Sequence, residues 1–382
     1  MVGGAVDRSW MQYSLDQYDG YDPGIVIPES IANNKASATV DLPFNNTATN
    51  SPIVYAPQLL GFAVGRLFNL RSGTTYRLAE ICMIAVYALL MYCAVMALPK
   101  WRIPVGLLLL RSFKCVRFAS FSISADSLTQ AVMILFSCLL FRGIIGKRSQ
   151  RGAVALAVTS VLLAMCKFVY MPLVLLVIPL MFDRVSGRWR VNRGRAVPLL
   201  IGVVASGVWT IFWLGVNAWY TNCPMLVSCK QMSERKHALL TDPVAMLDAV
   251  KNIAWAITHA QSNMNNRTDS IMIAACWLAI VVSVVVLAVT SVVNACVKSR
   301  RKNPVRTANG SINACGVLSL PYAWLIAVVC IGDIVLIYLA LWLQYDADGL
   351  IGVDGMQFRY FLPYAPLFAF VMLESGRRLL KQ

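Results

Sequence analysis

Long apolar blocks separated by short polar connectors make up most of the chain after residue 76. The blocks run for roughly 15 to 27 residues, which is the length that a helix needs to cross about 30 Å of hydrocarbon. A strand barrel would instead show short segments of alternating hydrophobicity. The pattern therefore predicts an all-α, polytopic transmembrane helix bundle of about nine spans. We place them near 77–98, 103–122, 125–142, 152–166, 168–182, 196–218, 271–297, 318–343 and 358–376.

Four regions follow from this pattern. The chain opens with a polar segment rich in Asp, Asn, Thr and Pro, and it ends in a short basic tail. We assign residues 1–52 to an extracytoplasmic N-terminal segment, 53–76 to an interfacial or re-entrant helix, 77–376 to the transmembrane bundle with an external loop at 219–270, and 377–382 to a cytoplasmic tail.

The stretch from Ser51 to Leu70 is apolar, but Pro52, Pro57 and Arg66 interrupt it. These interruptions favour a helix at the membrane surface over a span. No apolar signal segment opens the sequence, so an external N-terminal segment needs another way across the membrane. Two alternatives stay open. Either a further helix precedes this sequence, which we favour, or the stretch itself spans the membrane and the start is cytoplasmic.

Composition and charge agree with a membrane protein. Of the residues, 58% are hydrophobic and 14% are charged, whereas soluble domains carry about 25% charged residues. The net charge is +16, but half of the Lys and Arg lie in short stretches beside apolar blocks, where such residues mark cytoplasmic connectors. This predicts no nucleic-acid partner and a cytoplasmic C-terminus. The basic stretches are 142–151, 184–195, 298–306 and 377–381.

The cysteines suggest one disulfide and no metal site. Most of the 11 Cys lie in apolar blocks, where Cys behaves as a small hydrophobe. No CxxC or Cys/His spacing typical of zinc occurs, and the chain has 2 His. We therefore predict no metal and no evident cofactor. Cys223 and Cys229 differ, because both fall in the polar loop assigned to the outside, where a disulfide can form.

Three cations recur every third residue inside the block 103–122, at Arg111, Lys114 and Arg117. Charges at that depth are costly toward lipid and commonly face a cavity. One interpretation is a cationic stripe that binds phosphate, with bidentate contacts from Arg and a point charge from Lys. The alternative is that the span ends earlier and the side chains extend to the headgroups.

Two charged residues stand at predicted outer turns. Asp126 follows Ser124 in SISADS, where it either caps the next helix or serves as a polar ligand and catalytic candidate. Lys167 separates two apolar runs, against the usual bias for cations inside. Asp333 lies within a span, where an acid is either functional or a neutral, hydrogen-bonded group.

The last external stretch places Gln357, Arg359 and Tyr360 at the entrance of the final span. Aromatic residues are ordinary there, but an outer Arg needs an anion as partner. Because enclosure around an anion is less costly than exposure of each cation to lipid, we predict that the charged residues converge on one outer cavity. The converging residues are Arg111, Lys114, Arg117, Asp126, Lys167 and Arg359.

Five segments carry a family resemblance. They are Asn50 to Gly65 (NSPIVYAPQLLGFAVG), Arg77-Leu78, Ser122 to Leu128 (SISADSL), Lys167 to Pro172 (KFVYMP) and Gln357 to Pro363 (QFRYFLP). In this order, and from about residue 50 onward, the chain resembles the domain of unknown function 2142 family. This family of bacterial polytopic membrane proteins is grouped with the GT-C glycosyltransferases.

The resemblance implies a GT-C-like fold in the bacterial plasma membrane and transfer of sugar from a polyprenyl-phosphate carrier to the cell envelope on the outer face. It also implies a catalytic acid in the first external loop, often assisted by a divalent metal. The acid-His motif of related proteins is absent here, so enzymatic activity stays open. The alternatives are a non-catalytic scaffold of envelope assembly, and a transporter or flippase of lipid-linked or anionic solutes.

Overall fold

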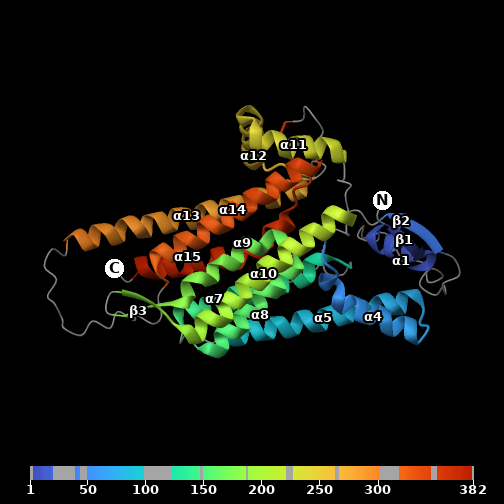
Figure 1. Cartoon of the computed structure of the whole chain (residues 1–382), viewed down its shortest axis with the longest axis horizontal. Helices are drawn as coiled ribbons and strands as arrows, with labels where there is room; N and C mark the ends of the chain where they lie inside the picture. Colours follow the sequence, from blue (N-terminus) through green and yellow to red (C-terminus); the bar gives the residue numbers. More distant parts are fainter. Residues whose placement is uncertain are drawn as a thin grey trace. The chain divides into compact units, whose positions relative to one another are not determined.

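A computed structural model gives the arrangement of the helices (Figure 1). It describes residues 3–19, 39–43, 50–98, 123–146, 149–185, 188–220, 227–262, 266–300, 318–345 and 351–380. Helices dominate these residues, so the predicted all-α, membrane-type bundle is confirmed. The chain divides into two compact units. The first comprises Met1–Leu135, Met165–Phe168 and Thr210–Cys223, and the second Phe136–Ala164, Val169–Trp209 and Pro224–Gln382.

The first unit contains a small two-stranded sheet and two packed helices that are joined by a short turn. Strands β1 and β2 pair antiparallel, with Gly3 opposite Pro43. Its elements are β1 (Gly3–Asp7), α1 (Arg8–Asp19), β2 (Thr39–Pro43), η1 (Pro52–Tyr55), α4 (Ala56–Leu67), α5 (Ser72–Ala97), the start of α7 (Ala125–Ile145) and the end of α10 (Arg193–Tyr220). Helix α1 packs on α5, since Tyr13 meets Tyr76 with ring centroids 5.2 Å apart.

The prolines near residue 50 start helices rather than break them. Pro52 and Pro57 each lie in the first turn of a helix, η1 and α4, where the missing N–H has no partner to lose. The Ser51 side chain accepts a hydrogen bond from the Ile53 N–H at 3.3 Å and so begins η1. Asn69 takes a positive φ of 46° in the turn between α4 and α5, a conformation that Asn tolerates. The predicted helix therefore exists, while its interfacial placement stays a prediction.

Helices α4 and α5 pack together at backbone distance. A Cβ atom added at Gly61 would lie 2.5 Å from the Cα of Ala79, so only glycine fits there. A Cβ at Gly65 would lie 2.4 Å from the Thr75 side chain. Small residues that let backbones approach are the usual means of helix association in membranes.

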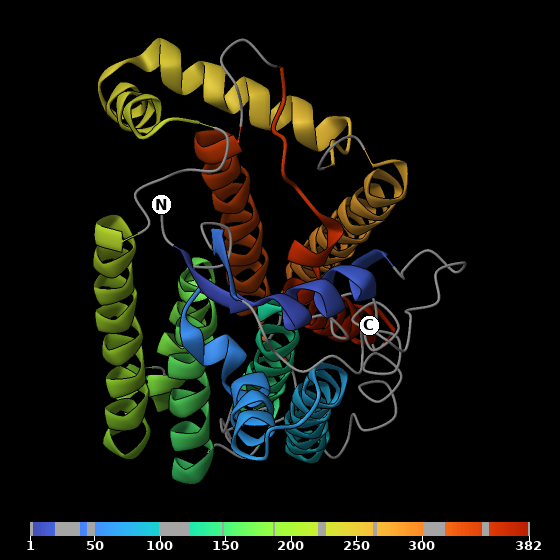
Figure 2. The same cartoon turned by 90° about the vertical axis from the view of Figure 1, so that its right-hand side faces the viewer.

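The second unit holds most of the remaining elements, and Figures 1 and 2 show α13, α14 and α15 side by side. Trp324 on α14 donates to the Ser291 hydroxyl of α13 at 3.1 Å. The elements are α8 (Gln150–Cys166), η3 (Phe168–Tyr170), α9 (Met171–Val174), η4 (Leu175–Met181), β3 (Phe182–Val185), β4 (Arg188–Val191), α10 (Arg193–Tyr220), α11 (Cys229–Thr241), α12 (Pro243–Thr258), α13 (Arg267–Arg300), α14 (Leu320–Tyr345), η6 (Phe358–Tyr360), η7 (Leu362–Tyr364) and α15 (Ala365–Leu379).

Five helices in the described part of the chain are long and apolar enough to cross a membrane: Ser72–Ala97, Ala125–Ile145, Arg193–Ala218, Arg267–Val297 and Leu320–Gln344. Each overlaps a predicted span. The segments predicted at 152–166, 168–182 and 358–376 form shorter helices: α8 has 17 residues, Phe168–Met181 is broken into 3-10 and α turns, and α15 has 15 residues. The block 103–122 lies outside the described residues. The count of nine therefore stays a prediction.

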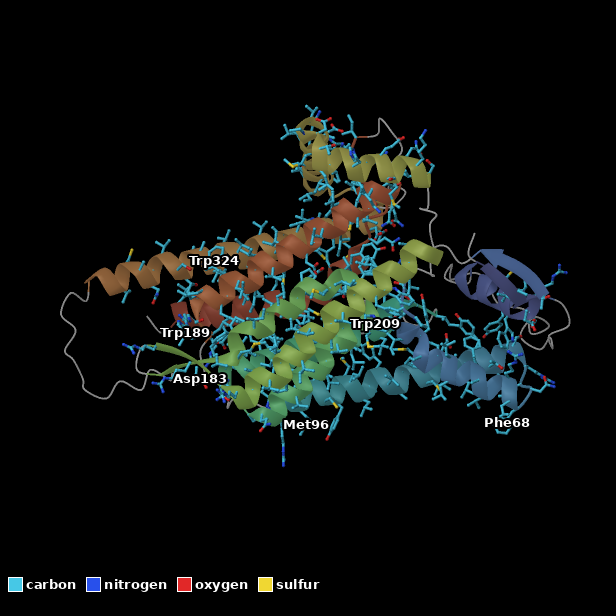
Figure 3. All side chains as sticks on the ribbon, in the orientation of Figure 1. Phe68, Met96, Asp183, Trp189, Trp209 and Trp324 are labelled. Atoms are coloured by element: carbon cyan, nitrogen blue, oxygen red, sulfur yellow. The ribbon has the colours of Figure 1, made fainter. Side chains whose placement is uncertain are left out.

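Several of these helices expose broad apolar faces. In the most apolar 18-residue stretches of α5, α10 and α13, only 22%, 17% and 22% of the stretch is buried. Phe68 in the α4–α5 turn and Met96 on α5 are 67% and 43% exposed, and both lie at the surface in Figure 3. Contiguous apolar surface of this extent is rare on soluble monomers. It is what a bilayer requires of the lipid-facing side of a span.

The loop predicted at 219–270 contains two helices, α11 and α12. Ser228 and Gln231 form a capping box at the start of α11, and Asp242 caps α12 by accepting from the Val244 N–H at 2.9 Å. Helix α12 packs against α14 and buries Ile253 and Ala256. The sequence analysis predicted neither of these helices.

Candidate functional site

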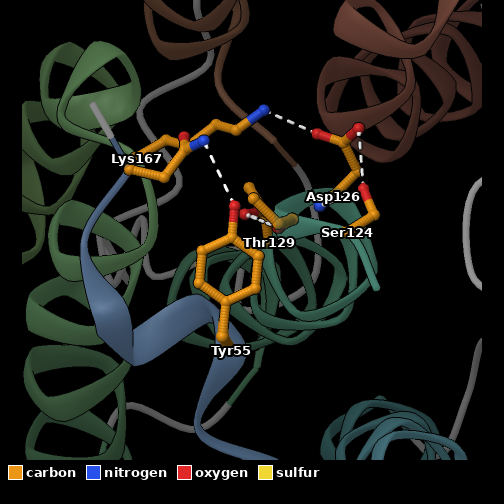
Figure 4. A network of polar contacts seen from close by, with 7 residues as sticks. Tyr55, Ser124, Asp126, Thr129 and Lys167 are labelled. Atoms are coloured by element: carbon orange, nitrogen blue, oxygen red, sulfur yellow. Dashed lines mark hydrogen bonds and ion pairs between the residues drawn. The ribbon is translucent and has the colours of Figure 1, made fainter. Parts of the chain in front are cut away.

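In the first unit, Asp126 and Lys167 form an ion pair (Figure 4). The Lys167 Nζ donates to Asp126 Oδ1 at 2.5 Å, although the residues are 41 positions apart. The Lys167 side chain is 15% exposed and the Asp126 side chain is 19% exposed. The pair is therefore mostly shielded from solvent, but a ligand can still reach it. Both residues were predicted as site residues from the sequence, and the structure brings them together.

The local sequence explains how Asp126 is held. Helix α7 begins at Ala125, and the hydroxyl of the preceding Ser124 accepts a hydrogen bond from the Asp126 N–H at 3.2 Å. The same hydroxyl donates to Asp126 Oδ2 at 3.3 Å. An acid in the first turn of a helix also interacts favourably with the helix dipole. The capping interpretation and the ligand interpretation are thus compatible, because Ser124 caps the helix and leaves Asp126 to bind Lys167.

Tyr55 brings the first of the five family segments, Asn50 to Gly65, to this site. It ends η1, and its hydroxyl accepts a hydrogen bond from the Asn50 side chain at 3.5 Å. Figure 4 shows Tyr55 in the same network of polar contacts as Thr129, Asp126 and Lys167. Thr129 lies one turn after Asp126 and donates to the Ala125 carbonyl at 2.7 Å. The segments NSPIVYAP, SISADSL and the start of KFVYMP therefore meet around one ion pair. Tyr55 was missed as a site residue from the sequence.

In the second unit, the predicted residue Gln357 directly precedes η6, and Arg359 and Tyr360 lie within it. The Arg359 guanidinium carbon lies 5.8 Å from the centre of the Tyr360 ring. Arg359 also interacts electrostatically with Asp269, which accepts from the Phe358 N–H at 3.4 Å. Asp269 is in the first turn of α13. The pairing of Asp269 with residue 359 was not predicted from the sequence.

Helix α12 and the turn after it hold the segment before η6. The Gly352 N–H donates to Asn252 Oδ1 at 2.9 Å, and the Val353 N–H donates to Gln261 Oε1 at 2.9 Å. Gly352 has a φ of +104°, and a Cβ there would lie 1.9 Å from Gln261 Oε1. This position therefore requires glycine. Asn252 and Gln261 are positioning residues that the sequence analysis did not find.

A buried acid lies deeper in the second unit. Asp333 on α14 is 1% exposed, and its Oδ2 accepts from the Tyr364 hydroxyl at 2.8 Å. The Tyr364 ring meets Tyr170 edge-on, with centroids 5.7 Å apart. This is the hydrogen-bonded arrangement that was one of the two alternatives for Asp333. It also joins the end of KFVYMP to the segment after QFRYFLP.

Other site predictions are not tested by this structure. Arg111, Lys114 and Arg117 lie outside the described residues. Lys167 and Arg359 belong to different units, so their convergence on one cavity stays a prediction. No group of three or more His, Cys, Asp or Glu suited to a metal occurs among the residues that the structure describes, and we assign no metal ligands there.

The disulfide is also still a prediction, because Cys223 and the Cys229 side chain lie outside the described part. We expect the two thiols to pair in the mature protein, since both fall in the loop assigned to the oxidising side. Alkylation followed by intact-mass measurement, with and without reductant, checks this. Two alkylated thiols at these positions in the unreduced sample would contradict the pairing.

Comparison with known proteins identifies the family. A family model described as "Predicted membrane protein (DUF2142)" matches residues 27–368. The chain belongs to the DUF2142 family. The family match includes all five segments on which the resemblance was based, so that expectation is confirmed. The DUF2142 description names a membrane protein and no activity. No curated protein and no solved structure matches this chain.

Proposed function

We propose that this membrane protein is a GT-C-type glycosyltransferase. It would take a sugar from a polyprenyl-phosphate carrier on the outer face and transfer it during modification of the envelope glycan. The observation that carries the proposal is the Asp126–Lys167 pair, which places a proton acceptor and a phosphate ligand side by side at 2.5 Å. The family membership restricts the setting to a membrane and leaves the reaction open.

The chemistry assigns one role to each member of the pair. Asp126 accepts the proton of the acceptor hydroxyl as its oxygen attacks the anomeric carbon, which is general base catalysis. A carbon–oxygen bond forms on the acceptor side while the bond between the anomeric carbon and the phosphate oxygen breaks. The polyprenyl phosphate leaves with the electron pair, and Lys167 stabilises its charge. Polyprenyl phosphate and the glycosylated acceptor are the products, and no oxidant is needed.

An ion pair is suited to such a site because the donor phosphate can replace Asp126 as the partner of Lys167. A donor phosphate competes with Asp126 for the Lys167 ammonium, since charge-assisted hydrogen bonds to phosphate and carboxylate are similar in strength. Binding of the donor then releases the carboxylate for its role as base. Tyr55 lies in the same network of polar contacts as Lys167 (Figure 4).

The remaining predicted residues supply further contacts to the lipid phosphate in this proposal. Arg359 offers a bidentate fork, with Gln357 and Tyr360 beside it. Arg111, Lys114 and Arg117 extend the cationic surface. A divalent metal, expected from the GT-C resemblance alone, is not required by the steps assigned to Asp126 and Lys167.

A transfer assay tests the proposal. The full-length protein is reconstituted in vesicles with a panel of polyprenyl-phosphate-linked hexoses and pentoses and a crude envelope glycan as acceptor. Mass spectrometry then measures the polyprenyl phosphate released. We expect release with at least one donor, dependent on the acceptor. Tight donor binding with no release, across the panel, would instead favour the scaffold. Movement of intact donor between leaflets would favour the flippase.

The topology of the proposal is checked separately. We propose a bacterial plasma membrane location in which the basic connectors and the C-terminus are cytoplasmic, because half of the Lys and Arg lie there. Single cysteines placed at Ser233 and Ser299, in a background without other cysteines, should then react with impermeant thiol reagents from opposite sides. Labelling of both from one side would exclude this topology.

A further inference from the structure

A cavity in the second unit is lined by the end of α7, the start of α8, η4 and the start of α10. Four leucines make up much of its wall, and its polar groups come from Arg142, Ser149 and Arg195. Arg142 is in the last turn of α7, whereas the candidate base Asp126 is in the first turn. The cavity is therefore built from residues that the proposed transfer reaction does not use.

Arg195 is the central observation. It is 5% exposed, and its Nη2 pairs with the carboxylate of Asp183 on β3. Its Nη1 is buried and has no hydrogen-bond partner among the described residues. A buried, charged donor without an acceptor is unfavourable. Because Arg195 lines the cavity, an anion bound there would supply the missing acceptor.

The other polar groups that line the cavity also favour a negatively charged ligand. Arg142 carries a second guanidinium to the cavity. The Ser149 hydroxyl accepts from the Gly152 N–H at 3.1 Å and so caps α8, a helix of 17 residues whose N-terminus favours anions. Gly152 lines the cavity too, and a Cβ there would lie 3.1 Å from Ser149 Oγ. Among the described residues, the carboxylate that contacts these groups is that of Asp183.

We propose that this cavity binds a phosphate-bearing anion, with the headgroup of an anionic phospholipid as the favoured source. Two guanidiniums and a helix N-terminus match phosphate oxygens, and the leucine wall matches the start of an acyl chain. The stretches 142–151 and 184–195 are predicted to be cytoplasmic, and basic pockets between membrane helices on that side commonly hold anionic lipid headgroups. Free phosphate shares this chemistry and is the second possible source.

Binding to the full-length protein distinguishes the sources. The protein in detergent is titrated with phosphatidylglycerol, phosphatidylcholine or inorganic phosphate, and native mass spectrometry counts bound molecules. We expect phosphatidylglycerol to bind in preference to phosphatidylcholine. Loss of one guanidinium in Arg142→Gln or Arg195→Gln should weaken that binding by about fivefold. Saturable binding of inorganic phosphate with the same dependence would support the site and identify free phosphate as its ligand.

Arg193→Gln is the matched control. Arg193 is exposed at the start of α10, the helix that carries Arg195, and its substitution removes the same charge. It should leave binding unchanged. Arg142→Gln is the variant less prone to misfolding, because Arg142 is exposed. Arg195→Gln also removes the ion-pair partner of Asp183. Two results would overturn the proposal. One is equal binding by Arg142→Gln and the Arg193→Gln control. The other is no preference for phosphatidylglycerol over phosphatidylcholine, together with no binding of inorganic phosphate.

Discussion

Replacing Asp126 by Asn should lower the rate of sugar transfer by about 10²- to 10⁴-fold, the contribution of a positioned general base. Asn keeps the size of the side chain and can still accept a hydrogen bond from Lys167, so the local structure is retained. It cannot accept the proton of the acceptor hydroxyl. The measurement is release of polyprenyl phosphate at saturating donor, with donor binding recorded in the same sample.

Glu234→Gln is the matched control for this change. It converts a carboxylate to an amide on α11, where the side chain is 63% exposed and its pair with Lys230 is long, at 3.9 Å. Transfer by this variant should equal that of the unaltered protein. A rate for Asp126→Asn within about threefold of the control would remove Asp126 from the reaction, because the loss expected of a general base is far larger.

Lys167→Met separates binding from proton transfer. It removes the cation proposed to hold the donor phosphate, so KM for the donor should rise along with the loss in kcat. Lys167→Arg keeps the charge and should retain donor binding better than Met. If both substitutions left KM unchanged, Lys167 would be a structural partner of Asp126 rather than a phosphate ligand.

Replacing Gly61 by Val should destabilise the first unit by about 1 to 3 kcal/mol or more, the usual cost of overpacking. The new Cβ would meet the Cα and N atoms of Ala79 at 2.5 Å. These are backbone atoms, which cannot move aside as a side chain can. Helices α4 and α5 would have to separate, and η1 with Tyr55 directly precedes α4. Thermal unfolding of the purified protein in detergent measures the effect.

Gly215→Val controls for the change in helix propensity. Gly215 lies on α10, and a Cβ there meets nothing within 4 Å. Valine at that position carries the same intrinsic preference without a clash. We expect a small shift in the unfolding temperature for Gly215→Val and a large downward shift for Gly61→Val. Equal shifts for the two variants would show that α4 and α5 do not pack at this distance.

Much of the architecture could be predicted from the sequence, because it depends on local properties. Hydropathy over some twenty residues decides whether a segment can cross a bilayer. The spans predicted at 196–218 and 271–297 accordingly match the helices Arg193–Ala218 and Arg267–Val297. The start of α7 was also local information, since the Ser124 hydroxyl accepts from the Asp126 N–H at the helix N-terminus.

The breaks in the shorter helices were harder to predict. The segment 168–182 is apolar enough for a span, but it folds as short 3-10 and α turns and leads into β3. Pro179 lies inside η4, where proline removes a hydrogen-bond donor from the helix, whereas Pro172 is in the first turn of α9. Elsewhere the prolines at 52 and 57 begin helices. The same residue type thus has opposite effects, depending on whether its position is the first turn or the interior.

The sequence by itself determined the helical class, the membrane setting and the residues most in need of a partner, because the costs of burying apolar and charged groups follow from each segment alone. Only the tertiary structure decided the partners. It joined Lys167 to Asp126 across 41 positions, Phe358 to Asp269 across 89 and Gly352 to Asn252 across 100. Which helices become neighbours depends on the packing of many small contacts at once. No local pattern contains that information.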